Sequence, residues 1–404
     1  MKAKVIGLAL AGLLAAVTPA RAQISDDVVK IAVLTDHSGV FAYLVGKYSV
    51  IAAQMAVDDF GGKVLGKPIE VITGDHQNKA DLASSLSRNW FDTQGVDALA
   101  DVAGSAVALA AQEIARTRDK ILLVTSAATM ELTGKACSET TTQWSYDTYA
   151  LAKGTAREVT KQGGDTWFFL TSDYAMGHSL QRDATHFVEE AGGKVLGSVR
   201  FPFATPDFSS FLLQAQGSGA KVVGLATSGS DLVNAIKQAG EFGVVQAGQR
   251  LAGLIVYIND IEGLGLEVAQ GLTLTTSFYW DRDEETRAWA KRFMERSGGF
   301  IPSMITAGTY ASVLHYLKAI EAAGTDEGKA VAAKMRELRV NDFYNKDVEI
   351  RADGRVMHKM YLVKVKSPSE SKARGDFYDV LAEIPADQAF RPLSESPCPL
   401  VRRN

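Results

Sequence analysis

Residues 121–149 read ILLVTSAATMELTGKACSETTTQWSYDTY, an apolar run that leads directly into a turn of small and hydroxyl-bearing residues. The run from Ile121 to Val124 is typical of a strand buried on both faces of a parallel sheet. The turn from Thr125 to Thr129 offers hydroxyls and backbone amides at the end of that strand, where open α/β sheets bind ligands. An ordinary strand-to-helix turn with a Ser or Thr cap would explain the same residues without a ligand.

Strand and helix patterns alternate on both sides of this stretch. Before it we expect strands over 28–34, 67–74 and 96–101, with helices over 45–60 and 79–92 and a third that begins at Gly104-Ser105 and has 109–116 as its later part. After residue 147 the alternation restarts, with strands over 165–170, 193–200, 221–226, 251–257 and 271–277. This repetition predicts doubly wound parallel sheets. Because the chain is too long for one ordinary domain, we expect an α/β fold with two doubly wound lobes.

The last part of the chain predicts further helices, a hairpin and a loop. Helices are expected over 282–297, 303–323 and 329–338. Strands over 346–351 and 356–365 flank Ala352-Asp353-Gly354-Arg355, which is typical of a hairpin turn. The tail is rich in Pro and is expected to be a loop.

The N-terminus and the charge balance indicate an exported protein. Lys2 and Lys4 precede an apolar run over 5–17 and the pattern Ala20-Arg21-Ala22, which is typical of a cleaved signal peptide over 1–22. An uncleaved anchor is the alternative, although the run is shorter than the roughly 20 residues that span a bilayer. The 43 Lys and Arg residues nearly balance 47 Asp and Glu, so the composition indicates neither nucleic acid nor anionic lipid as a partner.

The chain has two cysteines, Cys137 and Cys398. In an exported protein an even pair favours a disulfide. We therefore expect the C-terminal tail to be tied back to the loop that follows the Thr125–Thr129 turn. Two independent buried thiols are the alternative.

Turns in the first unit carry the chemistry of an anion site. Ser38 with Tyr43, Gly104 with Ser105, and the Thr125–Thr129 turn place hydroxyls or bare amides where strands end and helices begin. Helix N-termini hold carboxylates without a lysine, because their amides are unpaired and carry partial positive charge. The sequence therefore predicts a carboxylate ligand, bound among others by Ala127, Ala128 and Thr129.

The comparable positions of the second unit are aromatic or small. Tyr174 could close over the body of a ligand, or it could pack on its own helix. The turn Ser228-Gly229-Ser230 and Asp260 follow later strands, and Asp260 is a candidate partner for a ligand ammonium. Tyr279 lies in Phe278-Tyr279-Trp280, whose rings line a cleft or pack against a hinge strand.

The sequence shows no set of catalytic residues. The six histidines lack metal-ligand spacing, and neither a nucleophile elbow nor a phosphate-binding loop is present. We expect no enzyme, no metal and no cofactor.

The signal peptide, the opening KIAVLTDHSGVFAYLVGKYSVIAAQMAVDDFGG, the TSAAT turn and the segment SDYAMGHS together resemble type I periplasmic substrate-binding proteins of ABC importers, in the leucine/isoleucine/valine-binding branch. The resemblance covers essentially the whole mature chain. It implies two lobes joined by three crossovers, with the ligand enclosed by hinge closure. The first lobe would comprise 23–147 and 278–351, the second 148–277 and 352–390, and the tail 391–404 would be tied to the first.

The resemblance also implies roles for individual residues. Ser105, Ala127 and Thr129 would hold the ligand carboxylate, Tyr43 and Tyr174 would flank its body, and the Ser228–Ser230 turn with Asp260 would face it from the second lobe. The DHSGV opening, the FYWD segment and the C-terminal cysteine are similar to a sub-branch that binds aromatic acids such as benzoate or cinnamate derivatives. The ligand is therefore expected to be an amino acid or an aromatic acid.

The leading hypothesis is a monomeric periplasmic receptor that delivers a small carboxylate to a membrane permease with a cytoplasmic ATPase. A sensory module that signals to a chemoreceptor or histidine kinase is one alternative. A secreted enzyme on the same scaffold is another.

Overall fold

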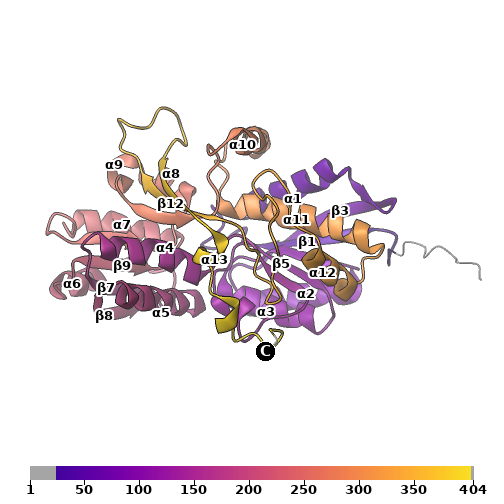
Figure 1. Cartoon of the computed structure of the whole chain (residues 1–404), viewed down its shortest axis with the longest axis horizontal. Helices are drawn as coiled ribbons and strands as arrows, with labels where there is room; N and C mark the ends of the chain where they lie inside the picture. Colours follow the sequence, from indigo (N-terminus) through magenta and orange to yellow (C-terminus); the bar gives the residue numbers. More distant parts are fainter. Residues whose placement is uncertain (1–23, 402–404) are drawn as a thin grey trace, which may run out of the picture.

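The structure is a computed structural model that describes residues 24–401 (Figure 1). The predicted signal peptide over 1–22 lies outside the described residues. Two parallel sheets with their helices lie side by side along the long axis of the molecule. We call the six-stranded sheet with its helices the first lobe and the four-stranded sheet with its helices the second lobe. The predicted α/β fold with two doubly wound lobes is confirmed. Within the described range no helix is both long and apolar enough to cross a membrane.

The first lobe has the strand order β2-β3-β1-β4-β5-β6, in which all neighbours are parallel except β2 and β3. Its central strands are buried on both faces, which explains their continuous apolar sequences. The strands are β1 (Val29–Thr35), β2 (Lys63–Val64), β3 (Lys67–Asp75), β4 (Ala98–Asp101), β5 (Ile121–Val124) and β6 (Thr141–Gln143). The helices are α1 (Lys47–Phe60), α2 (Ala80–Thr93), α3 (Ser105–Arg116), α10 (Glu284–Ser297), α11 (Met304–Ala323), α12 (Gly328–Glu337) and the short η1 (Met130–Thr133).

The second lobe has a parallel sheet in the order β10-β9-β7-β8. Its strands are β7 (Thr166–Ser172), β8 (Lys194–Phe201), β9 (Val222–Ala226) and β10 (Arg250–Gly253). Its helices are α4 (Thr148–Lys161), α5 (Ala175–Glu190), α6 (Ser209–Gly217), α7 (Ser230–Glu241), α8 (Ile258–Leu264) and α9 (Leu266–Ala269). In both lobes the carboxyl ends of the strands face the other lobe. The sequence predicts ligand-binding turns at these ends, so a shared site can form between the lobes.

A third, antiparallel sheet of β11 (Thr273–Thr276), β12 (Met360–Val365) and β13 (Tyr378–Ile384) packs on α4. The predicted hairpin turn at Ala352-Asp353-Gly354-Arg355 is present, because the Gly354 amide donates to the Arg351 carbonyl at 2.9 Å and Ile350 forms an antiparallel bridge with Val356. The long flanking strands predicted over 346–351 and 356–365 are wrong, since pairing ends after this bridge and β12 lies between β11 and β13. The predicted final loop contains β13, whose interior is exposed and therefore lacks the apolar signal of a buried strand. The short α13 (Ala386–Ala389) and η2 (Leu393–Glu395) follow it.

The chain passes between the lobes at residues 143–147, 277–283 and 354–359. The first and third of these segments run side by side, because the Gln143 amide donates to the Gly354 carbonyl at 2.9 Å and the Val356 amide donates to the Gln143 carbonyl at 3.1 Å. The hinge is therefore a two-stranded ribbon at this point. The residue boundaries predicted for the lobes stay a prediction.

Arg355 is fully buried in this hinge ribbon. Its guanidinium donates to the carbonyl oxygens of Trp144 and Tyr146, the second at 2.9 Å, and its Nη1 lies 3.6 Å from the Asp147 carboxylate. Burial lowers the pKa of Arg355 to about 10, and Asp147 opposes that shift, so the side chain stays charged at neutral pH. The Phe390 ring covers the guanidinium, with the ring centroid 4.4 Å from Arg355 Cζ. Arg355 thus fixes the backbone of the first connecting segment to the third.

The C-terminal tail continues from the third sheet across the hinge to the first lobe. Cys137 and Cys398 form a disulfide with their Cα atoms 5.7 Å apart, across a sequence separation of 261 residues. The predicted disulfide is confirmed. The tail is also held by a hydrogen bond of 2.7 Å from Arg351 to the Arg391 carbonyl. The disulfide therefore holds the tail against the first lobe, where Cys137 follows η1.

Replacing both cysteines, Cys137→Ser with Cys398→Ser, is expected to lower the free energy of unfolding by roughly 2–5 kcal/mol, because the disulfide restricts a long loop of the unfolded chain. Thermal melting under oxidising conditions measures the effect. Wild-type protein with reductant is the control and should melt like the variant. Equal melting temperatures for the oxidised wild type and the variant would contradict the expectation.

Candidate functional site

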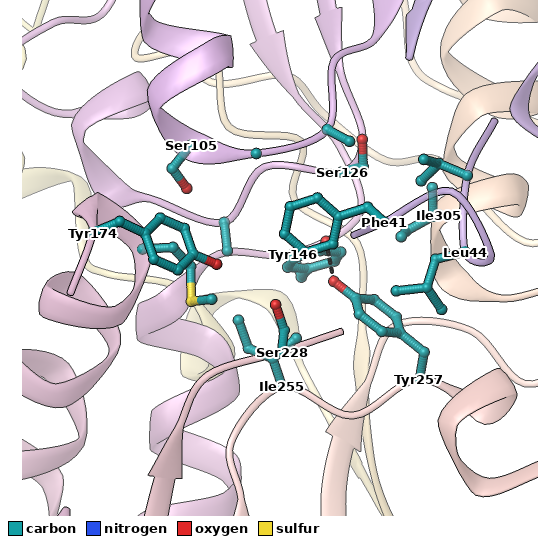
Figure 2. A pocket seen from close by; sticks show the side chains of 15 residues that line it. Phe41, Leu44, Ser105, Ser126, Tyr146, Tyr174, Ser228, Ile255, Tyr257 and Ile305 are labelled. Carbon is teal, nitrogen blue, oxygen red and sulfur yellow. Dashed lines mark hydrogen bonds between the residues drawn. The ribbon is translucent and has the colours of Figure 1, made fainter. Parts of the chain in front are cut away.

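A cavity lies between the two lobes, beyond the carboxyl ends of strands from both sheets (Figure 2). The empty space between its lining atoms, part of it open to solvent, is about 340 Å³. Among residues 24–401 no charged side chain lines it. The lining residues are Phe41, Leu44, Val45, Ala103, Gly104, Ser105, Ser126, Ala128, Tyr146, Tyr174, Met176, Ser228, Ile255, Tyr257 and Ile305.

The N-terminus of α3 faces the cavity through Ser105, whose hydroxyl points into it in Figure 2. The first hydrogen bond inside the helix is donated by Ala108, so the preceding amides have no acceptor within it. The Ser105 hydroxyl accepts from the Thr129 amide at 3.3 Å and keeps its own proton for a ligand. Gly104 has φ 90°, and a Cβ there would lie 2.4 Å from the Asn78 side-chain oxygen, so this approach requires glycine.

The hydroxyl of Ser126, in the cavity lining, already donates its proton to another residue of the protein. It donates at 2.5 Å to the buried carboxylate of Asp101, which also accepts from Thr125 at 3.1 Å and Thr35 at 2.6 Å. Burial raises the pKa of Asp101, and these hydroxyls oppose that shift. Ser126 therefore presents lone pairs rather than a proton to the cavity.

The second lobe contributes Tyr174, Met176 and Ser228. The Tyr174 ring packs edge-on against Phe203 with ring centroids 4.9 Å apart. Burial raises the pKa of Tyr174, so its hydroxyl stays protonated, and the Ser228 hydroxyl opposes the shift. These side chains add neutral hydrogen-bonding groups to the wall that faces α3.

Asp260 joins the lobes beside the cavity. Its carboxylate accepts from the Tyr43 hydroxyl of the first lobe at 2.5 Å and from the Tyr257 amide at 2.8 Å. Burial raises the pKa of Asp260 to about 7, and both hydrogen bonds oppose that shift. Thr129 and Ser179 form a second hydrogen bond between the lobes, of 3.1 Å. The lobes are therefore in contact around the cavity.

Of the predicted ligand-binding residues, four line the cavity: Ser105, Ala128, Tyr174 and Ser228. Six lie outside its lining: Tyr43, Ala127, Thr129, Ser230, Asp260 and Tyr279. The ligand contacts of all ten stay a prediction.

Each residue outside the lining is engaged elsewhere in the fold. The Ala127 carbonyl accepts from the Gln143 side chain at 2.8 Å. Ser230 is the first residue of α7. The Tyr279 hydroxyl lies 3.4 Å from Asp376, and its ring packs on Tyr378 with centroids 5.3 Å apart. Tyr279 therefore belongs to the core beneath the third sheet.

The sequence analysis missed most of the apolar lining: Phe41, Leu44, Val45, Met176, Ile255 and Ile305, together with the pair Tyr146 and Tyr257. Most of these residues lie on loops, where hydrophobic periodicity carries no signal. Their positions in the sequence could have indicated some of them, because Phe41, Ile255 and Tyr257 follow soon after the ends of β1 and β10. Over residues 24–401 no group of three or more His, Cys, Asp or Glu side chains is placed to hold a metal ion.

The chain is similar to known proteins along most of its length. The model of the periplasmic binding protein family matches residues 28–373. A periplasmic binding protein from Burkholderia mallei is 48% identical, with 93% of this chain and all of that one covered and a TM-score of 0.91. A branched-chain amino acid ABC transporter periplasmic ligand-binding protein from Burkholderia xenovorans LB400 is 40% identical, with 93% of this chain and 100% of that one covered and a TM-score of 0.83.

A further relative is the Leu/Ile/Val-binding protein homolog 6 of Brucella melitensis, which is 29% identical over 318 residues, 77% of this chain and 80% of that protein. The family match includes both lobes and the turns that line the cavity. The chain therefore belongs to the periplasmic binding protein family.

Proposed function

We propose that the protein is the periplasmic substrate-binding component of an ABC importer, exported by the signal peptide over 1–22. Its ligand is a small carboxylate with an uncharged, apolar body, such as an aromatic acid, and it is handed to a membrane permease. The observation that carries this proposal is the cavity, which combines a helix N-terminus with apolar walls and, over the described residues, has no charged side chain in its lining.

The carboxylate of the ligand would lie at the N-terminus of α3. The unpaired amides there carry partial positive charge and point at the site. The free proton of Ser105 adds a charge-assisted hydrogen bond, worth about 1.5–3 kcal/mol for a bond to a charged group. Neutral donors suffice for a single carboxylate, as in other helix N-terminal anion sites.

An amino acid ligand would bring an ammonium that this cavity does not neutralise. The carboxylates of Asp101 and Asp260 beside the cavity accept hydrogen bonds from protein hydroxyls and stay outside the lining. Burying an ammonium without a paired carboxylate is unfavourable. The site therefore favours acids without an amino group.

The body of the ligand would be held by burial. Phe41, Leu44, Ile255 and Ile305 form apolar walls, and apolar surface removed from water contributes about 25 cal/mol per Å². Contact between the lobes around the cavity reduces the access of water to that surface, which is the use of hinge closure. The titratable side chains of the lining are tyrosines kept protonated by burial, so the ligand is expected to be released unchanged.

Ser105→Ala is expected to weaken binding of an aromatic acid about 10- to 100-fold, the loss of one charge-assisted hydrogen bond. Thermal shift and titration calorimetry with benzoate measure the effect. Ser230→Ala is the matched control, since Ser230 also begins a helix but lies outside the lining. In cells, the same Ser105→Ala change should reduce uptake of the labelled acid at low concentration. Equal affinity of both variants would contradict the assigned carboxylate site.

Asp260→Asn tests whether Asp260 joins the lobes or binds the ligand. The ordinary aspartate pKa of about 3.9 is raised to about 7 here. Its stabilising contribution is therefore fully present below about pH 4 and is lost as the pH rises through about 7. The variant should lose this pH dependence of unfolding, measured from pH 4 to 8, while its affinity for benzoate stays within about tenfold. Parallel pH curves, or loss of acid binding, would count against this role.

A further inference from the structure

Two tyrosine hydroxyls meet in the cavity wall away from Ser105. Tyr146 follows the hinge ribbon and Tyr257 precedes α8, and both side chains are buried. Their oxygens are 2.5 Å apart, and their rings pack edge-on with centroids 5.9 Å apart. In the view of Figure 2, Ser105 lies to one side of Phe41 and Tyr257 to the other, with the bond between the tyrosines drawn as a dashed line. The cavity therefore has a second polar point.

The tyrosine pair has one hydroxyl proton that lacks an acceptor among the described residues. Each hydroxyl has one proton and two lone pairs. The bond between the tyrosines uses one of the two protons, and within residues 24–401 it is the only hydrogen bond that either hydroxyl makes. One proton therefore remains to be donated, whichever tyrosine carries it. A buried donor left without an acceptor costs about 1–3 kcal/mol.

The described residues around the pair do not supply the missing acceptor. Leu44, Ile255 and Ile305 are apolar, and the hydroxyls of Ser126, Tyr174 and Ser228 in the same lining form no hydrogen bond with either tyrosine. Burial raises the pKa of both tyrosines, so the pair keeps both protons at neutral pH. A ligand oxygen in the cavity is the acceptor that would satisfy the remaining donor.

We propose that this site selects acids that carry a second, uncharged oxygen, a hydroxyl or oxo group, which accepts the free proton of the Tyr146–Tyr257 pair. The inference rests on the proposed function of the same cavity. The carboxylate takes the α3 end, where the amides are partly positive. The hydroxyl or oxo oxygen takes the tyrosine end, where a single neutral donor is offered in an apolar setting.

Such a donor discriminates strongly against acids that lack the oxygen. A site built to hydrogen-bond a substrate oxygen rejects the analogue without it, because the buried protein group is then left unpaired. We expect wild-type protein to bind the oxygenated acid at least about tenfold more tightly than its parent. The position of the second oxygen on the ligand decides which isomer can reach the tyrosine pair. The test therefore uses two ligand skeletons.

The experiment is titration calorimetry with two matched series. The aromatic series is benzoate with 3-hydroxybenzoate and 4-hydroxybenzoate, and the aliphatic series is pentanoate with 4-oxopentanoate. The proteins are wild type, Tyr146→Phe, Tyr257→Phe and the double variant. Tyr279→Phe is the control, because it removes a tyrosine hydroxyl outside the lining. Melting temperatures confirm that each variant folds.

The expected result is a preference of at least about tenfold for an oxygenated acid in wild type and in Tyr279→Phe. The double variant should bind oxygenated and parent acids within about twofold, with affinity for the parent retained. One single variant, lacking the hydroxyl that donates to the ligand, should behave like the double variant. The other should keep part of the preference.

Two results would overturn the inference. Equal binding of parent and oxygenated acids by wild type would refute the tyrosine assignment and leave the proposed carboxylate site standing. A preference that survives in the double variant would do the same. Failure of every acid in both series to bind wild type would overturn the proposed function and this inference together.

Discussion

The contact on which the structure depends most is the buried guanidinium of Arg355 in the hinge ribbon. It binds two carbonyl oxygens of the first connecting segment and lies beside Asp147. Removing one partner of such a buried pair costs about 3–5 kcal/mol, because the other charge is left uncompensated. One of the two carbonyls belongs to Tyr146, whose ring lines the cavity. Arg355 therefore holds both the hinge ribbon and a residue of the cavity wall.

The charged groups near the cavity are engaged with the scaffold, and the described lining of the cavity is neutral. Asp101 is surrounded by hydroxyls, Asp260 bonds Tyr43 across the lobes, and Arg355 holds the hinge. The described lining keeps hydroxyls, amides and apolar side chains. Such a site can hold a carboxylate firmly enough for capture without forming a buried ion pair. Under the proposed function, reopening the lobes would release the ligand without separating buried opposite charges.

The sequence allowed prediction of the fold to a useful extent because continuous apolar strands such as β5, separated by helices, have a strong pattern. The edge strand β13 was not predicted, because its middle residues are exposed and lack an apolar pattern. Ser105 and Ser228, which line the cavity, could be named as candidates because turns after strands carry recognisable chemistry. Tyr146 and Tyr257 were not paired, because their meeting depends on how two distant loops are held across the hinge.

The central claim is that the cavity binds an acid and excludes an ammonium. The most direct measurement compares matched ligands of one carbon skeleton, leucine with 4-methylpentanoate and phenylalanine with 3-phenylpropanoate, by titration calorimetry on purified wild-type protein. The account predicts that any skeleton that fits binds at least about 100-fold more tightly without its amino group, the cost of a buried unpaired charge. Tighter binding of the amino acid in either pair would contradict it.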